Sequence, residues 1–163
     1  MTMTFNMTFK LPFVVVPAAL LSLGATAALA GETFQQSGAL GCIIDKWNEK
    51  EVEKGHKLVD SAIRCAVIPD DPNEEKVFET CSGKYEYKPD ESWKGSGICT
   101  DTYKDGSTIV MDWEEGSHLK EYTYNKTGGT GKYKGVAGGG KYTYDNINDS
   151  FSGGRYKGTL TMP

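Results

Sequence analysis

The sequence of 163 residues has only two histidines, His56 and His118, and its four cysteines include no C-x-x-C pair. No C-x-x-C pair or neighbouring His completes a set of zinc ligands in this sequence, so disulfides are favoured over a zinc site and no metal is expected. A G-x-S-x-G elbow is also absent, and any Ser/His/Asp set would need one of the two histidines. The usual motifs of metal and nucleophilic catalysis are therefore missing, and no cofactor is expected.

Basic residues are scarce, because 18 Lys and Arg stand against 22 Asp and Glu. Nucleic-acid binding usually needs a basic face, so a nucleic-acid partner is not expected. The sequence also has only one long apolar run, Leu11 to Ala30, so the rest of the chain shows no membrane segment. Nothing in the composition indicates an oligomeric state.

The apolar run has the order of a secretory signal peptide. Lys10 precedes it, and it ends in the small-residue site Ala28-Leu29-Ala30, which predicts a signal peptide over residues 1–30. A membrane anchor is the alternative, since the run could span a bilayer, but Pro17 and the A-x-A site favour cleavage. The remaining residues, 31–163, are expected to form a single secreted or periplasmic domain. Loss of Lys10 leaves it 17 basic and 22 acidic side chains, a net charge of −5.

All four cysteines lie beyond the predicted signal peptide, at Cys42, Cys65, Cys81 and Cys99. An even number of cysteines in an exported chain favours disulfides over free thiols. Three connectivities are possible, and we favour Cys42–Cys65 with Cys81–Cys99 because each pair closes a compact local unit.

The chain changes character along its length. Between Ile43 and Ile68 apolar residues recur at spacings of three and four, which predicts a short helix near Lys57–Cys65 with a looser segment before it. From Glu75 onward, short stretches rich in Tyr, Thr and Val alternate with Gly and Asp turns. Several short strands of this kind indicate an antiparallel barrel or sandwich. Glu114 to Ser117 is predicted to be a turn whose two glutamates form a charge cluster.

The clearest hairpin signal is Asp105-Gly106, which lies between two predicted strands. A two-residue turn there would place Thr102 opposite Ile109 and Ile98 opposite Trp113. The apolar face would then hold Ile98, Thr100, Thr102, Ile109, Met111 and Trp113. The polar face would hold Cys99, Asp101, Tyr103, Thr108, Val110 and Asp112.

The most distinctive stretch is rich in glycine, with seven glycines among the thirteen residues from 128 to 140. A phosphate-binding loop does not fit, because Gly131-Lys132 is followed by Tyr133 and Lys126 stands where the first glycine belongs. Glycine at this density instead predicts a tight structural turn. The turn residues are expected to be Gly128, Gly129, Gly131 and Gly135.

The run Thr127-Gly-Gly-Thr-Gly-Lys-Tyr133, with Gly135 behind it, resembles the signature of the dirigent and allene oxide cyclase barrels. The similarity covers residues 95–162, under half of the chain. It implies a mainly β fold, an eight-stranded antiparallel barrel with an apolar cavity, to which this chain would add its short N-terminal helical segment. The cysteine-bearing first half departs from the family pattern.

Aromatic residues supply the candidate binding site. Tyrosines alternate along two predicted strands, and with a nearby tryptophan they could line a pocket whose hydroxyls orient a ligand. These ligand-binding candidates are Trp113, Tyr122, Tyr124, Tyr142 and Tyr144. The weaker catalytic candidates are Asp101 and Asp112, on the polar face of the hairpin, and His118, at a barrel rim.

Three functions follow from these observations, and the sequence leaves open whether the protein is an enzyme. The first is a non-catalytic exported barrel that binds a small apolar or aromatic molecule. The second, which rests on the family resemblance, is a cofactor-free cyclase, lyase or isomerase acting in the cavity. The third is a protein-binding inhibitor or envelope partner.

Overall fold

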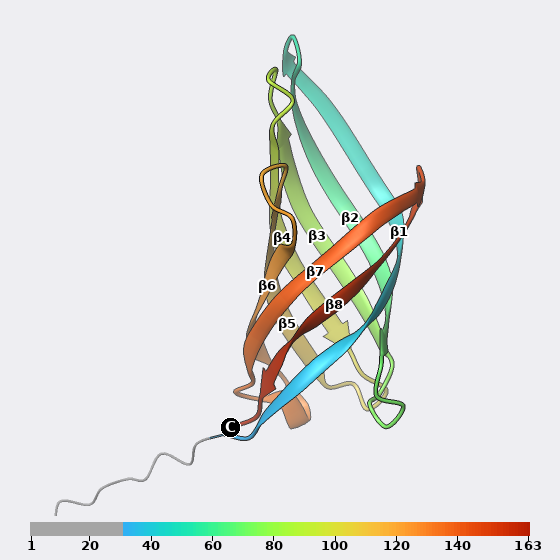
Figure 1. Ribbon diagram of the computed structural model, residues 1–163, viewed down its shortest axis with the longest axis vertical. Helices are drawn as coiled ribbons and strands as arrows, with labels where there is room; N and C mark the ends of the chain where they lie inside the picture. Colours follow the sequence, from blue (N-terminus) through green and yellow to red (C-terminus); the bar gives the residue numbers. More distant parts are fainter. Residues whose placement is uncertain (1–30) are drawn as a thin grey trace, which may run out of the picture.

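The computed structural model describes residues 31–163, in which eight antiparallel strands close into a barrel (Figure 1). The strands are β1 (Thr33–Glu53), β2 (His56–Pro69), β3 (Val77–Tyr87), β4 (Trp93–Thr102), β5 (Thr108–Gly116), β6 (Tyr122–Gly129), β7 (Ala137–Asn148) and β8 (Phe151–Thr161). A short 3-10 helix, η1 (Gly131–Tyr133), lies between β6 and β7. The predicted eight-stranded antiparallel barrel is confirmed. The predicted signal peptide, residues 1–30, lies outside the described residues.

Side chains alternate between the interior and the outer surface along the strands, as barrel geometry requires. In β5, for example, Ile109, Met111 and Trp113 are buried, whereas Asp112 and Glu114 are exposed. The interior of the barrel is therefore formed by every second residue of each strand. Over residues 31–163, no helix is long and apolar enough to cross a membrane.

The helix predicted near Lys57–Cys65 is wrong, because this segment lies within β2. The buried residues of β2 include Val59, Ser61 and Cys65, which follow the period of two that a strand requires. Leu58 stands on the outer surface, 43% exposed. Apolar residues on both faces of this strand produced the helix-like spacing. The segment before it, expected to be looser, is the longest strand, β1, which pairs with β2 over residues 38–53.

The predicted register of the β4–β5 hairpin is wrong by one residue. Thr102 pairs with Thr108 and Asp101 pairs with Ile109, so the loop contains Lys104 as well as Asp105-Gly106. Gly106 has a φ of 80°, as the last residue of a three-residue hairpin loop commonly does. A one-residue change of register moves every side chain of one strand to the other face.

The buried face of this hairpin therefore holds the β5 residues that were predicted on the apolar face, together with the β4 residues that were predicted on the polar face. It contains Cys99, Asp101, Tyr103, Ile109, Met111 and Trp113. Ile98, expected on the apolar inner face, is instead 52% exposed on the outside. Asp101 and Asp112, expected side by side, lie on opposite faces of the barrel wall.

Both favoured disulfides are confirmed, Cys42–Cys65 and Cys81–Cys99. Each joins two residues that lie directly opposite one another on neighbouring strands, the first across β1–β2 and the second across β3–β4. Each therefore links the two strands of a hairpin, with sequence separations of 23 and 18 residues. A bridge of this kind commonly stabilises a domain by about 2–4 kcal/mol.

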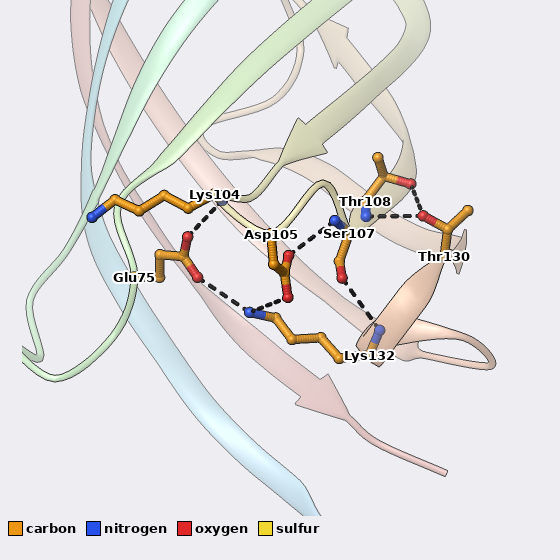
Figure 2. Close-up of polar contacts among 7 residues, drawn as sticks. All are labelled: Glu75, Lys104, Asp105, Ser107, Thr108, Thr130 and Lys132. Carbon is orange, nitrogen blue, oxygen red and sulfur yellow. Dashed lines mark hydrogen bonds and ion pairs between the residues drawn. The ribbon is translucent and has the colours of Figure 1, made fainter.

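Three loops are joined by polar contacts at the barrel end that also holds the C-terminus (Figures 1 and 2). Lys132 in η1 extends its Nζ to Glu75 Oε2 (3.2 Å), before β3, and to Asp105 Oδ2 (3.3 Å), in the β4–β5 loop. The other Glu75 oxygen accepts a hydrogen bond from the Lys104 backbone N–H at 2.6 Å. The Tyr103 and Tyr133 rings lie 4.3 Å apart at the same end. These contacts fix the β6–β7 connection against the two neighbouring loops.

The glycine-rich stretch divides between a strand end, a turn and a strand start. Gly128 and Gly129 end β6, whereas Gly131 and Gly135 lie in the connection to β7 at positive φ, 58° and 81°. Across Gly135, the Val136 backbone N–H donates to the Tyr133 carbonyl at 3.1 Å. Positive φ is unfavourable for residues with a Cβ, so this connection depends on glycine.

The variant Gly135→Val is expected to lower the free energy of unfolding by about 1–3 kcal/mol, because a β-branched side chain is strained at positive φ. Urea denaturation followed by circular dichroism measures the change. Gly128→Val is the matched control, since Gly128 has no positive φ and a Cβ there would meet no atom within 4 Å. Equal losses in the two variants would contradict the role assigned to Gly135.

Candidate binding cavity

The barrel interior contains a cavity of about 1200 Å³ that is lined by residues from all eight strands. Small-molecule sites in proteins commonly measure about 300–1,000 Å³, so this cavity has room for a ligand of several rings. It extends from Glu75, near the β2–β3 loop, to Asp149, in the β7–β8 turn. Side chains of the interior therefore leave much of the barrel unfilled.

Glycines on neighbouring strands help to keep this space open. A Cβ at Gly83 or Gly97 would collide with the Trp113 ring, which crosses β4 toward β3. A Cβ at Gly140 or Gly158 would likewise meet the Tyr124 hydroxyl, which reaches across β7 to β8. In both places an aromatic ring lies along the wall, over positions without side chains. The glycines after η1 thus also make room for an aromatic lining.

Seven aromatic side chains form a continuous cluster along one part of the cavity, which we call the aromatic cluster. Its members are Tyr85, Tyr87, Trp93, Trp113, Tyr122, Tyr142 and Tyr144. Neighbouring ring centroids are 5.4 to 6.5 Å apart, within the range of favourable aromatic contact. The rings come from β3, β4, β5, β6 and β7 and so surround this part of the cavity on several sides.

Glu115 lies among these rings, buried at 7% exposure near the end of β5. The Tyr142 hydroxyl donates to Glu115 Oε1 at 2.6 Å, and the Tyr144 hydroxyl donates to Oε2 at 2.9 Å. Burial raises the pKa of the Glu115 carboxyl, and the tyrosine hydrogen bonds act against that shift. Burial and the Glu115 charge raise the pKa of both tyrosine hydroxyls, which keeps them protonated as donors.

A second polar group, centred on Glu79 of β3 and Asp101 of β4, lies farther along the cavity. The two residues are directly opposite in register, and both are buried. Burial raises the pKa of Glu79 to about 8, with a further contribution from Asp101. Burial also raises the pKa of Asp101 to about 7, although nearby Lys126 favours the ionised form. Around neutral pH the two carboxyls can therefore share one proton, with Glu79 the more readily protonated member.

Lys126 of β6 supplies positive charge to this second group. Its Nζ donates to Gln36 Oε1 at 3.0 Å and to the Thr159 carbonyl at 2.9 Å, and burial lowers its pKa to about 8. Asp101 Oδ1 is nevertheless buried without a hydrogen-bond partner among the described residues. Asp101 pairs with Ile109, six residues before Glu115 on β5, so about 20 Å of strand separates the two acidic groups.

The structure places the predicted binding residues around one cavity. All five line it: Trp113, Tyr122, Tyr124, Tyr142 and Tyr144. Of the catalytic candidates, only Asp101 does so. Asp112 is on the outer face of β5, and His118 is exposed in the β5–β6 loop.

Sequence reasoning missed several cavity residues, above all Glu79, Lys126 and Glu115. The interpretation of Glu114 and Glu115 as a turn cluster is wrong, because β5 continues to Gly116. If the strand had been predicted to continue to Gly116, the alternation of inward and outward side chains from Ile109 would have placed Glu115 inside and Glu114 outside. Glu79 also lies close to Cys81 and Cys99, but those two sulfurs form a disulfide and are not available as thiolate ligands.

Comparison with solved structures agrees with the fold. The chain is similar to the pterocarpan synthase dirigent protein PsPTS1, with a TM-score of 0.55 and 12% identity, covering 82% of this chain and 97% of that one. The pterocarpan synthase dirigent protein GePTS1 gives the same score and identity over 82% of this chain and 92% of its own. No family model and no curated protein matches the sequence. The likeness shows a dirigent-like barrel fold.

The Glu79–Asp101 pair predicts a pH dependence of stability. Its folded-state pKa values exceed the ordinary values of 4.5 and 3.8, so the native state retains a proton that the unfolded chain releases. This contribution is present below the ordinary values and is lost as pH rises toward 8. Glu79→Gln should therefore reduce the fall in unfolding free energy between pH 5 and pH 8 by about 1–3 kcal/mol.

Urea denaturation at unit pH intervals measures this slope. Glu114→Gln, on the outer face of β5, is the control and should keep the wild-type slope. An unchanged slope in Glu79→Gln would show that the pair titrates normally in the folded protein.

Proposed function

We propose that this protein is an exported barrel that binds a small, largely aromatic molecule inside its cavity. The observation that supports the proposal is the unfilled interior bordered by the aromatic cluster. Close packing normally stabilises a protein interior, and empty apolar space is destabilising. A cavity of about 1200 Å³, bordered by rings that lie along its wall, therefore suits planar apolar ligands.

Two further observations agree with this function. The two disulfides suit an oxidising compartment, as expected of a secreted or periplasmic protein. The similar structures are described as pterocarpan synthase dirigent proteins, so this barrel type serves small-molecule chemistry in those proteins. That second argument is an analogy of fold, and the cavity lining carries the proposal for this chain.

Binding can be tested with N-phenyl-1-naphthylamine, a neutral aromatic dye whose fluorescence rises in apolar surroundings. Trp47, Trp93 and Trp113 all line the cavity, so a bound dye should quench their emission and gain fluorescence by energy transfer. We expect saturable binding with a stoichiometry of one. Trp93→Leu should weaken it about 3–10-fold, because one aromatic contact is lost.

The matched control is Phe78→Leu, which alters an aromatic residue that is 50% exposed on the outer face of β3. It should bind the dye like the wild-type protein. Equal losses in the two variants, or binding that does not saturate, would place the dye on the outer surface and contradict the proposal.

A second candidate function is proton transfer, and the Glu79–Asp101 pair is the specific observation that favours it. A carboxylate that is desolvated and shares a proton is suited to general acid–base chemistry on a substrate in the cavity. This corresponds to a cofactor-free cyclase, lyase or isomerase. The part of the protein in such a reaction would be to move a proton to or from a carboxyl oxygen, while the bonds that form or break are those of the substrate.

The probe reaction for this activity is the ring opening of 5-nitrobenzisoxazole. A base removes the C3 proton, the N–O bond breaks, and the coloured 2-cyano-4-nitrophenolate forms. We expect acceleration that increases as pH rises toward 8 and falls at least 10-fold in the Glu79→Gln, Asp101→Asn double variant. Acceleration that is equal in the double variant and in Glu114→Gln would exclude the pair as the base.

A further inference from the structure

The protein supplies no counter-ion for the Glu115 carboxyl inside the aromatic cluster. Glu115 forms no ion pair with a described residue, and each of its oxygens accepts a hydrogen bond from a tyrosine hydroxyl. The cavity lining of residues 31–163 contains only two cationic side chains, Lys126 and Lys132. Lys126 lies against Gln36 and Thr159, and Lys132 is paired with acids at the loop end of the barrel.

Two further acidic residues line the cavity on the β7 side and have the same sign as Glu115. They are Asp145, on β7, and Asp149, in the β7–β8 turn, and both are exposed. An anionic ligand would be repelled by these carboxylates, and a neutral ligand would leave the buried Glu115 carboxyl without a counter-charge, a condition in which burial raises its pKa. A cationic group at this position would supply that counter-charge.

The surrounding rings favour the same type of ligand. Aromatic faces attract a cation that lies within about 6 Å of the ring centroid, and organic ammonium groups are commonly held in this way. Each Glu115 oxygen already accepts one hydroxyl hydrogen bond, and aromatic rings surround it in the cavity lining. These surroundings favour a cation that is held by its charge and by ring faces over one that needs several directed hydrogen bonds. A methylated ammonium group meets this condition, since it has few or no N–H donors.

We infer that the aromatic cluster and Glu115 form a binding site for a methylated organic ammonium ion, with the apolar part of the ligand extending along the cavity. The inference rests on the proposed binding function and specifies the chemical class of its ligand. An inorganic divalent ion is a poorer fit, because no other Asp, Glu, His or Cys of residues 31–163 gathers with Glu115 into a set of three possible metal ligands.

The experiment compares two probes of nearly the same shape, phenyltrimethylammonium and its neutral carbon isostere tert-butylbenzene. Each is titrated against the protein by isothermal calorimetry and by displacement of N-phenyl-1-naphthylamine. We expect the cation to bind about 10-fold more tightly than the isostere. Equal or weaker binding of the cation would overturn the inference, while saturable dye binding would still support the proposed function.

Variants identify the group responsible. Glu115→Gln keeps the size of the side chain and its carbonyl acceptor but removes the charge, so the preference for the cation should disappear. Glu114→Gln removes a neighbouring charge on the outer face and should keep the preference. A preference that survives Glu115→Gln would also overturn the assignment.

Two outcomes separate this inference from the function on which it rests. If the dye and both probes fail to bind, the proposed function and the cation site are both wrong. If only phenyltrimethylammonium binds, the cation site stands and the broader preference for neutral aromatic molecules is wrong. The comparison of probes on the wild-type protein needs no variant, so it remains decisive if Glu115→Gln does not fold.

Discussion

Pairing of the first strand with the last is the constraint on which the rest of this barrel depends. β1 pairs with β8 over residues 33–43 and with β2 over residues 38–53, so its length allows it to contact both neighbours. Closure leaves the sheet without a free edge and assigns one face of every strand to the interior. Once that assignment is made, a polar residue at an inward position is buried whether or not it finds a partner.

Buried acidic side chains of the interior are compensated in two different ways. Around Asp101 the protein supplies its own compensation, since Lys126 lies nearby and Glu79 can hold a proton at neutral pH. Around Glu115 it supplies only hydroxyl donors. Hydrogen bonds from neutral groups stabilise a carboxylate less than a cation does. The Glu115 region is therefore the part of the cavity in which a ligand can contribute most electrostatically.

Local patterns predicted a β fold from turn residues between short strands, and both disulfides from cysteines that close compact units. The choice of an eight-stranded barrel over a sandwich came from the resemblance of the glycine-rich run to the dirigent and allene oxide cyclase barrels. The sequence did not predict the site correctly, because inside and outside depend on register. Because the hairpin loop includes Lys104, the faces of β4 are exchanged relative to the prediction, and Asp101, predicted on the polar face, is buried. The helix predicted over part of β2 failed for a related reason. Leu58 is exposed on the outer wall, and periodicity cannot distinguish such a residue from one in a core.

The aromatic candidates were easier to recognise because tyrosines two residues apart on a strand share a face in either register. Their partners were not recognisable, since the Trp113 ring crosses glycines of β4 and β3 that are distant in sequence. The same arrangement recurs at Tyr124, where the glycine-rich stretch meets β8. Rings that lie along the wall leave more of the lumen open, and their flat faces are directed toward a molecule bound in it. The glycines of this stretch thus have two roles. Those after β6 allow the chain to turn, whereas those in β7 leave room for an aromatic ring and so shape the cavity.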